Sequence, residues 1–139
     1  MKKFLLKRYE HKGSHILVNE FTDLGKFIVL ALIDRRKWKG ANALTESAKL
    51  TETITLVLPE DILKLVVDAS KLLRINIDMD RVFKSHLLVF IAANEQNGTP
   101  VRTACKKYLE YLNITQSEYS IDTAYKNYQR AIVKLRQSH

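Results

Sequence analysis

The sequence predicts a mainly α-helical fold with a minor β component, a small helical domain with one or two short strands. Apolar residues recur at the three- and four-residue spacing of amphipathic helices, most regularly between residues 98 and 136. Only two prolines and four glycines occur in 139 residues, which favours regular elements over long loops. Residues 53–58 alternate instead with the period of two of a half-buried strand. We expect one cooperative domain, in which a basic segment, residues 1–50, packs on a helical core, residues 51–139.

The first fifty residues contain a basic arm and a segment that allows two interpretations. The cations of the arm are Lys2, Lys3, Lys7, Arg8 and Lys12. Gly13 and Ser14 are expected to turn the chain after it. Residues 22–38 form either a helix capped by Thr22 or a hairpin turn followed by a buried strand over residues 27–33. We favour the helix.

The densest positive charge of the chain comes next, in the run Arg35, Arg36, Lys37, Trp38 and Lys39. Cations that flank a tryptophan suit contacts with phosphates and stacked bases, or with an anionic membrane surface. The other interpretation is a solvated helix end, where cations favour the negative pole of the helix dipole and Trp38 folds onto the core. Both interpretations stay open, so Arg35, Arg36, Lys37 and Trp38 are candidate nucleic-acid contacts.

Residues 51–94 predict a strand, a proline, a helix, a polar break and a second helix. In the strand, Ile54, Leu56 and Leu58 alternate with Thr53, Thr55 and Val57. Pro59 suits the first position of a helix over residues 60–73. A break is expected from Arg74 to Asp80, with Asp78 as the cap of the helix that follows.

This order of elements resembles the ribbon-helix-helix family of DNA-binding proteins, in which a strand ending in Leu-Pro precedes two helices. The resemblance implies that two chains pair their strands into a ribbon, which reads bases in the major groove. It assigns base reading to Thr53, Thr55 and Val57. It also implies a corner presented to a phosphate, which here would be Asp78, Met79 and Asp80.

Residues 97–136 predict a pair of amphipathic helices. Asn97-Gly98 should end the preceding helix at a left-handed C-cap, and Thr99 and Pro100 suit the start of the next helix. The apolar stripe of that helix is Val101, Ala104, Cys105, Tyr108 and Leu112. Ser120 is expected to cap the last helix. The last helix should bury Ile121, Ala124, Tyr125, Tyr128, Ala131, Ile132 and Leu135.

The pair resembles a helix-turn-helix of the resolvase or sigma-factor type. The matching residues are Gly98, Val101 and Ala104 in the support helix, and Ser120 and Thr123 at the start of the recognition helix. The expected connection of about seven residues is longer than the three or four usual in such motifs. The resemblance implies that the last helix enters the major groove. The residues facing DNA would be Asp122, Thr123, Lys126, Asn127 and Arg130, and the cations Lys134, Arg102 and Lys106 complete the candidate contacts.

The charge distribution agrees with a polyanionic partner. The net charge is +8 and the sequence pI is near 9.6. Residues 1–50 carry +6, residues 51–93 carry −1 and residues 94–139 carry +3. The two ends of the chain would therefore attract phosphates more strongly than the centre.

No pattern typical of an enzyme or a metal site accompanies this charge. The sequence has no Walker-type loop, dinucleotide fingerprint, Cys-x-x-Cys pair or His-Glu-x-x-His. His11 and His15 lie four residues apart without a further ligand nearby, so no metal is expected. The single cysteine, Cys105, lies on an apolar face and should be a buried, inert thiol. With no signal-peptide pattern and no apolar run of about 18 residues, we expect a cytoplasmic protein without a membrane span.

Together these features predict a non-enzymatic DNA-binding protein without a cofactor, with DNA favoured over RNA. A transcriptional regulator or accessory factor of a phage or mobile element would fit its size and class. The helix around residues 87–93 has more apolar surface than one small domain readily covers, so we expect a homodimer. The alternative is a structural or protein-interaction component, for virion assembly or host interaction, whose charge serves solubility.

Overall fold

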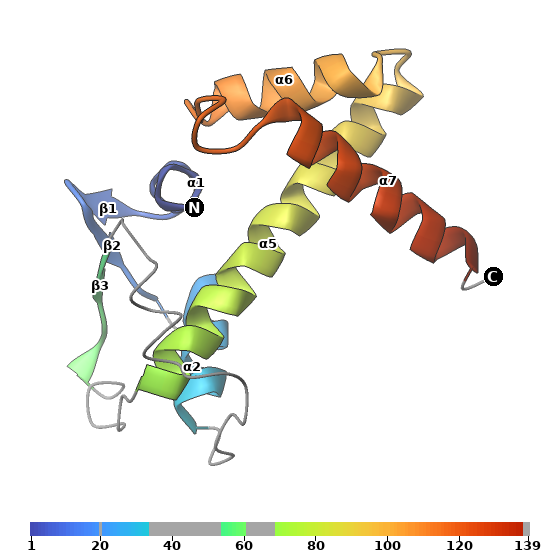
Figure 1. The fold of residues 1–139 in the computed structure, drawn as a ribbon. Coiled ribbons are helices and arrows are strands. Elements are labelled where there is room, and N and C mark those ends of the chain that lie inside the picture. Colours follow the sequence, from blue (N-terminus) through green and yellow to red (C-terminus); the bar gives the residue numbers. More distant parts are fainter. Residues whose placement is uncertain (20, 34–53, 61–68, 138–139) are drawn as a thin grey trace. The chain divides into compact units, whose positions relative to one another are not determined.

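The computed structural model describes residues 1–19, 21–33, 54–60 and 69–137. In these ranges the helices are α1 (Lys2–Arg8), α2 (Asp23–Ile33), α5 (Ala69–Gln96), α6 (Val101–Tyr111) and α7 (Ile121–Gln137) (Figure 1). The strands are β1 (His11–Lys12), β2 (His15–Leu17) and β3 (Thr55–Val57). The predicted mainly α-helical class with a minor β component is confirmed. The described sheet has three strands, where one or two were expected.

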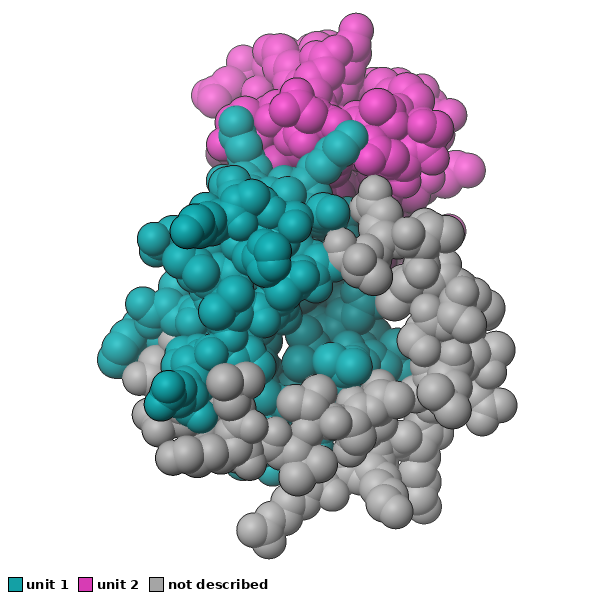
Figure 2. Space-filling model, turned by 90° about the vertical axis from the view of Figure 1, so that its left-hand side faces the viewer, with its two compact units in different colours: residues 1–81 teal, residues 82–139 magenta. Residues whose placement is uncertain are grey.

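The chain divides into two compact units, residues 1–81 and residues 82–139 (Figure 2). The division falls inside α5. The boundary expected at residue 50 lies outside the described residues. The buried apolar side chains of the first unit are Phe4, Leu5, Tyr9, Ile16, Val18, Leu24, Ile28, Ala31, Leu32, Ile75 and Met79. Those of the second unit are Phe83, Leu87, Ile91, Ala104, Cys105, Tyr108, Leu109, Leu112, Ala124 and Tyr128.

The sheet of the first unit is built around Ile16, which is fully buried. Strands β1 and β2 are antiparallel, and the predicted turn at Gly13 and Ser14 joins them. Gly13 has a φ of +61°, a backbone conformation that favours glycine. Strand β3 lies parallel to β2, with Leu56 opposite Ile16. Leu56 is half-buried between two exposed neighbours, so the alternation predicted for this strand is confirmed.

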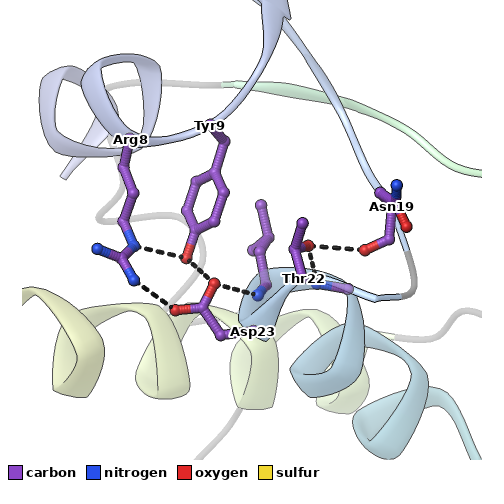
Figure 3. A network of polar contacts seen from close by, with 7 residues as sticks. Arg8, Tyr9, Asn19, Thr22 and Asp23 are labelled. Carbon is purple, nitrogen blue, oxygen red and sulfur yellow. Dashed lines mark hydrogen bonds and ion pairs between the residues drawn. The ribbon is translucent and has the colours of Figure 1, made fainter.

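Helix α2 begins with the predicted cap and is tied to the end of α1. Thr22 Oγ1 accepts a hydrogen bond from the Gly25 amide at 3.1 Å, which identifies Thr22 as the N-cap. The next residue, Asp23, accepts hydrogen bonds from Arg8 Nη2 at 2.8 Å and from the Tyr9 hydroxyl at 2.7 Å (Figure 3). Residues 23–33 are therefore the favoured helix and not the alternative hairpin. The basic arm before them contains a helix, α1, which the sequence analysis did not predict.

Helix α5 is continuous where the sequence predicted a break, so that prediction was wrong. Asp78 does not cap a helix. Its carboxylate pairs with Arg74 at 2.8 Å and Arg81 at 3.1 Å, one turn before and one turn after it. Charges three and four residues apart support a helix when their signs are opposite, which explains how this polar run stays helical. Most of the helix expected over residues 60–73 lies outside the described residues.

The end of α5 follows the prediction closely. Gly98 has a φ of +80°, and its amide donates to the Glu95 carbonyl while the Thr99 amide donates to the Asn94 carbonyl. This pair of bonds is the Schellman motif that ends many helices. Helix α6 then begins at Val101 with Pro100 as its N-cap, without a side-chain cap. The expected cap at Thr99 is therefore wrong by one residue, and no hydroxyl fills that role.

Helices α5, α6 and α7 bury small and aromatic side chains in the second unit. Ala104 and Cys105 of α6 and Ala124 of α7 are fully buried. The Phe90 and Tyr108 rings join α5 to α6, with centroids 5.0 Å apart. Such aromatic contacts add to the burial of apolar area. The expected thiol burial is confirmed, and desolvation raises the pKa of Cys105.

Candidate nucleic-acid interface

Helix α7 is held to its unit by its inner face. Ser120 Oγ accepts a hydrogen bond from the Thr123 amide at 3.1 Å, so the predicted cap is confirmed. Ala124 and Tyr128 are buried, and the Tyr128 hydroxyl donates to the Glu95 carboxylate at the end of α5. Burial and this hydrogen bond raise the pKa of Tyr128 to about 12. The opposite face of α7 is thereby turned to solvent.

The buried stripe of α7 is shorter than the sequence predicted. Half-burial is seen for Ile121, Tyr125, Ala131 and Ile132. Leu135 is 60% exposed, so its predicted burial is wrong. Figure 1 shows the reason: the second half of α7 extends beyond α6 and the end of α5, which therefore do not cover Leu135. The sequence pattern identifies the apolar face but not how far the neighbouring helices cover it.

The outward face of α7 carries Lys126, Arg130 and Lys134, which we call the α7 basic strip. All three side chains are exposed, and their four-residue spacing places them on one side of the helix. Within the described part of the chain, neither Lys126 nor Arg130 forms an ion pair. The strip is therefore a row of exposed cations on a helix whose other side is fixed by packing.

Two of the residues predicted to face DNA are engaged inside the protein. The Asn127 side chain is half-buried, and its amide donates to the Tyr119 hydroxyl at 2.5 Å. Thr123 Oγ1 shares a hydrogen bond of 2.9 Å with Ser120 Oγ. Both contacts hold the connection before α7 against its first turns. The residues would have to leave these partners to reach a base.

Arg102 of α6 is engaged as well, through a contact that sequence reasoning missed. Its guanidinium pairs with Asp122 at 2.8 Å and lies 4.9 Å from the centre of the Tyr125 ring. Twenty positions separate Arg102 from Asp122, and helical periodicity gives no signal at that distance. The other α6 candidate, Lys106, approaches Glu110 of its own helix at 3.8 Å. That exposed pair is worth at most a few tenths of a kcal/mol.

The connection between α6 and α7 has its own ordered turns, and the seven residues between the caps Leu112 and Ser120 match the predicted length. Asn113 has a φ of +56° and ends α6, with its amide bonded to the Glu110 carbonyl and the Ile114 amide to the Leu109 carbonyl. The Glu118 carboxylate then accepts hydrogen bonds from the backbone amide and the hydroxyl of Thr115, each at 2.7 Å. These bonds make the connection a defined turn.

The other candidate contacts lie in the first unit or outside the described residues. Arg35, Arg36, Lys37, Trp38 and Thr53 lie outside the described residues. Thr55 and Val57 are exposed on β3, which pairs with β2 of its own chain. The phosphate-facing corner implied at residues 78–80 is absent, because these residues lie within α5.

No protein-family model, curated protein or solved structure matches this chain. A function can therefore be proposed only from the geometry of the described residues. None of the described helices combines the length and the apolar character needed to cross a membrane. Over the same residues, His, Cys, Asp and Glu side chains do not gather in groups of three that could hold a metal ion.

Proposed function

We propose that the protein is a non-enzymatic DNA-binding protein and that the α7 basic strip is its main contact. The observation that carries the proposal is the row of three exposed cations on the outward face of a helix whose inner face is fixed. Contacts between cations and phosphates supply most of the free energy of non-specific binding to nucleic acids. The second half of α7 extends beyond α6 and the end of α5 (Figure 1), and an exposed helix can lie in the major groove of DNA.

Duplex DNA fits this surface better than duplex RNA. The major groove of B-form DNA is wide enough to admit an α-helix. The major groove of A-form RNA is deep and narrow, and side chains cannot enter it. A single exposed helix such as α7 therefore favours DNA.

A second candidate function is protein–protein interaction, and exposed apolar side chains favour it. On α7, Val133 is 51% and Leu135 60% exposed. On α2, Leu30 is 65% and Ile33 57% exposed. Leu30 and Ile33 lie three residues apart and share one face of α2, whereas Val133 and Leu135 are two residues apart and lie on different sides of α7. An apolar face such as that of α2 is typical of surfaces that bind other proteins. In this alternative the cations of α7 would serve solubility and the protein would not bind DNA.

The two candidate functions can be distinguished by measuring the binding of a labelled DNA duplex by fluorescence anisotropy at a series of salt concentrations. We expect the logarithm of the affinity to fall linearly with the logarithm of salt concentration between about 50 and 200 mM. Lys126→Ala and Arg130→Ala should each weaken binding about five- to tenfold near 0.1 M salt and reduce the slope by about 0.9, the loss of one phosphate contact.

The matched control is Lys26→Ala, which removes one exposed cation from α2 in the first unit. It changes the net charge by the same amount as the α7 variants. We expect its affinity and salt slope to stay close to those of the parent. Absence of DNA binding at low salt would overturn the proposal. Equal losses of affinity in Lys26→Ala and Arg130→Ala would contradict the assignment of α7 as the main DNA contact.

A further inference from the structure

The proposed interface has few side chains left with which to distinguish one base pair from another. Base reading in the major groove relies on amide or guanidinium groups that form paired hydrogen bonds, with hydroxyl groups in a lesser role. In the first three turns of α7, the part of such a helix that meets base edges, the polar side chains of this kind are Thr123, Asn127, Gln129 and Arg130. Their existing contacts therefore decide what α7 can recognise.

The three uncharged side chains of this set are already hydrogen-bonded within the protein. Thr123 is bonded to Ser120, and Asn127 donates to Tyr119. Gln129 Nε2 donates to the Tyr125 hydroxyl at 2.8 Å. Each of them would have to break an existing hydrogen bond to contact a base, so most of the gain from a base contact would be cancelled.

The bond from Asn127 is the hardest of the three to give up. Its partner, Tyr119, packs edge-on against the Phe83 ring of α5, with centroids 5.4 Å apart. The hydroxyl that accepts the bond is therefore held in place by an aromatic contact. Asn127 is also half-buried, so an amide turned outward would leave a polar group of Tyr119 without its donor.

The charged groups around the start of α7 are engaged in the same way. Arg102, which could otherwise read guanine, is held between Asp122 and the Tyr125 ring. The same ion pair neutralises Asp122, the acidic residue in the first turn of α7. The basic strip is therefore the part of α7 that is available to contact DNA, and its lysines act as point charges toward phosphates.

We infer that the α7 basic strip recognises the phosphate backbone and that DNA binding by this protein is independent of base sequence. The inference rests on the proposed function and specifies its ligand as duplex backbone of any sequence. Arg130 contributes as a cation, and its paired donors are not used for a base. The protein would then cover or compact DNA and would not select an operator.

The test is a panel of duplexes of equal length and different sequence, including one of A·T pairs only and one of G·C pairs only. One well-made paired contact to a base discriminates about 5- to 100-fold. We expect all members to bind within about threefold of one another at the same salt concentration, below the effect of a single base contact. Repeated selection from a random pool should enrich no motif.

Two variants locate the contact. Arg130→Lys keeps the charge and removes the planar pair of donors, so it should bind every duplex as the parent does. Arg130→Ala should weaken binding to every duplex by the same factor. The matched variant Asn127→Ala should leave the ratios between duplexes unchanged.

The outcomes separate this inference from the proposed function. Binding with a preference of about fivefold or more for one sequence, the lower end of a base contact, would overturn the inference and leave DNA binding in place. A change of preference in Arg130→Lys or Asn127→Ala would overturn it in the same way. Failure to bind any duplex at low salt would overturn the proposed function itself, and the inference with it.

Discussion

Asp23 joins α1 to α2, and its replacement by alanine should destabilise the first unit. The Arg8–Asp23 ion pair is 35% and 39% exposed, so solvent screens it and limits its contribution to about 1 kcal/mol at most. The hydrogen bond from the buried Tyr9 hydroxyl contributes about 1 kcal/mol more. The position in the first turn of α2 adds about 0.3–1 kcal/mol through the helix dipole. Asp23→Ala should therefore lower the free energy of unfolding by about 1.5–3 kcal/mol.

A double-mutant cycle in urea isolates the contact between Asp23 and Tyr9. The parent, Asp23→Ala, Tyr9→Phe and the double variant are unfolded and followed by circular dichroism. We expect a coupling energy of about 1 kcal/mol, because Tyr9→Phe removes only the hydroxyl, which donates to Asp23 and accepts from Arg8 Nε at 3.3 Å. Glu10→Ala, the loss of an exposed carboxylate next to Tyr9, is the control and should change stability by about 0.5 kcal/mol or less. Additive effects within about 0.3 kcal/mol would refute the network.

The same network gives the stability a defined pH dependence. Burial raises the pKa of the Asp23 carboxyl, but hydrogen bonds from Arg8 and Tyr9 outweigh burial and hold the pKa below its usual value. This contribution is present above about pH 4, the unfolded pKa, and is lost as pH falls through the lower folded pKa. Burial, with the bond to Asp23, raises the pKa of Tyr9 to about 12. That contribution is present below about pH 10 and is lost as pH rises toward 12, a loss that Tyr9→Phe should not show.

Two further predictions concern the second unit. Gly98→Ala should cost about 1–2 kcal/mol in urea unfolding, because a φ of +80° is strained for a residue with a Cβ, although an added Cβ would meet no atom within 4 Å. Gly98→Asn should cost less because asparagine tolerates this conformation, and the reverse order would contradict the argument. We also expect a homodimer in light scattering at micromolar concentration, since Val89 and Leu135 are 69% and 60% exposed. A monomer under those conditions would be the contrary result.

Local signals in the sequence were sufficient for the ends of several elements. The caps at Thr22 and Ser120, the turn at Gly13 and the helix end at Gly98 were all predicted and are all present. Each depends on hydrogen bonds between residues that are close in sequence, so a short stretch of sequence is enough to predict it. The break predicted at residues 74–80 failed because a run of charges was taken as a loop. The same charges pair along one face of α5.

The candidate site was predictable as a face but not as a set of available side chains. Periodicity placed Lys126 and Arg130 on the outward side of α7, where the structure has them. The partners of Asn127 and Arg102 lie 8 and 20 positions away, on other elements, and could not be inferred from spacing. Leu135 shows the same limit for burial. Amphipathicity predicts the face of the helix on which a side chain lies, but only the tertiary arrangement determines whether neighbouring elements bury it.

The continuity of α5 has a practical consequence for dividing the chain into fragments. A cut between the two compact units, at Arg81 and Val82, would fall in helical backbone with no linker on either side. A fragment starting at Val82 would begin with amides that have lost their carbonyl partners, and one ending at Arg81 would leave carbonyls open. Expression of either half calls for a designed capping sequence, and proteases that need extended backbone should find no early cleavage point there.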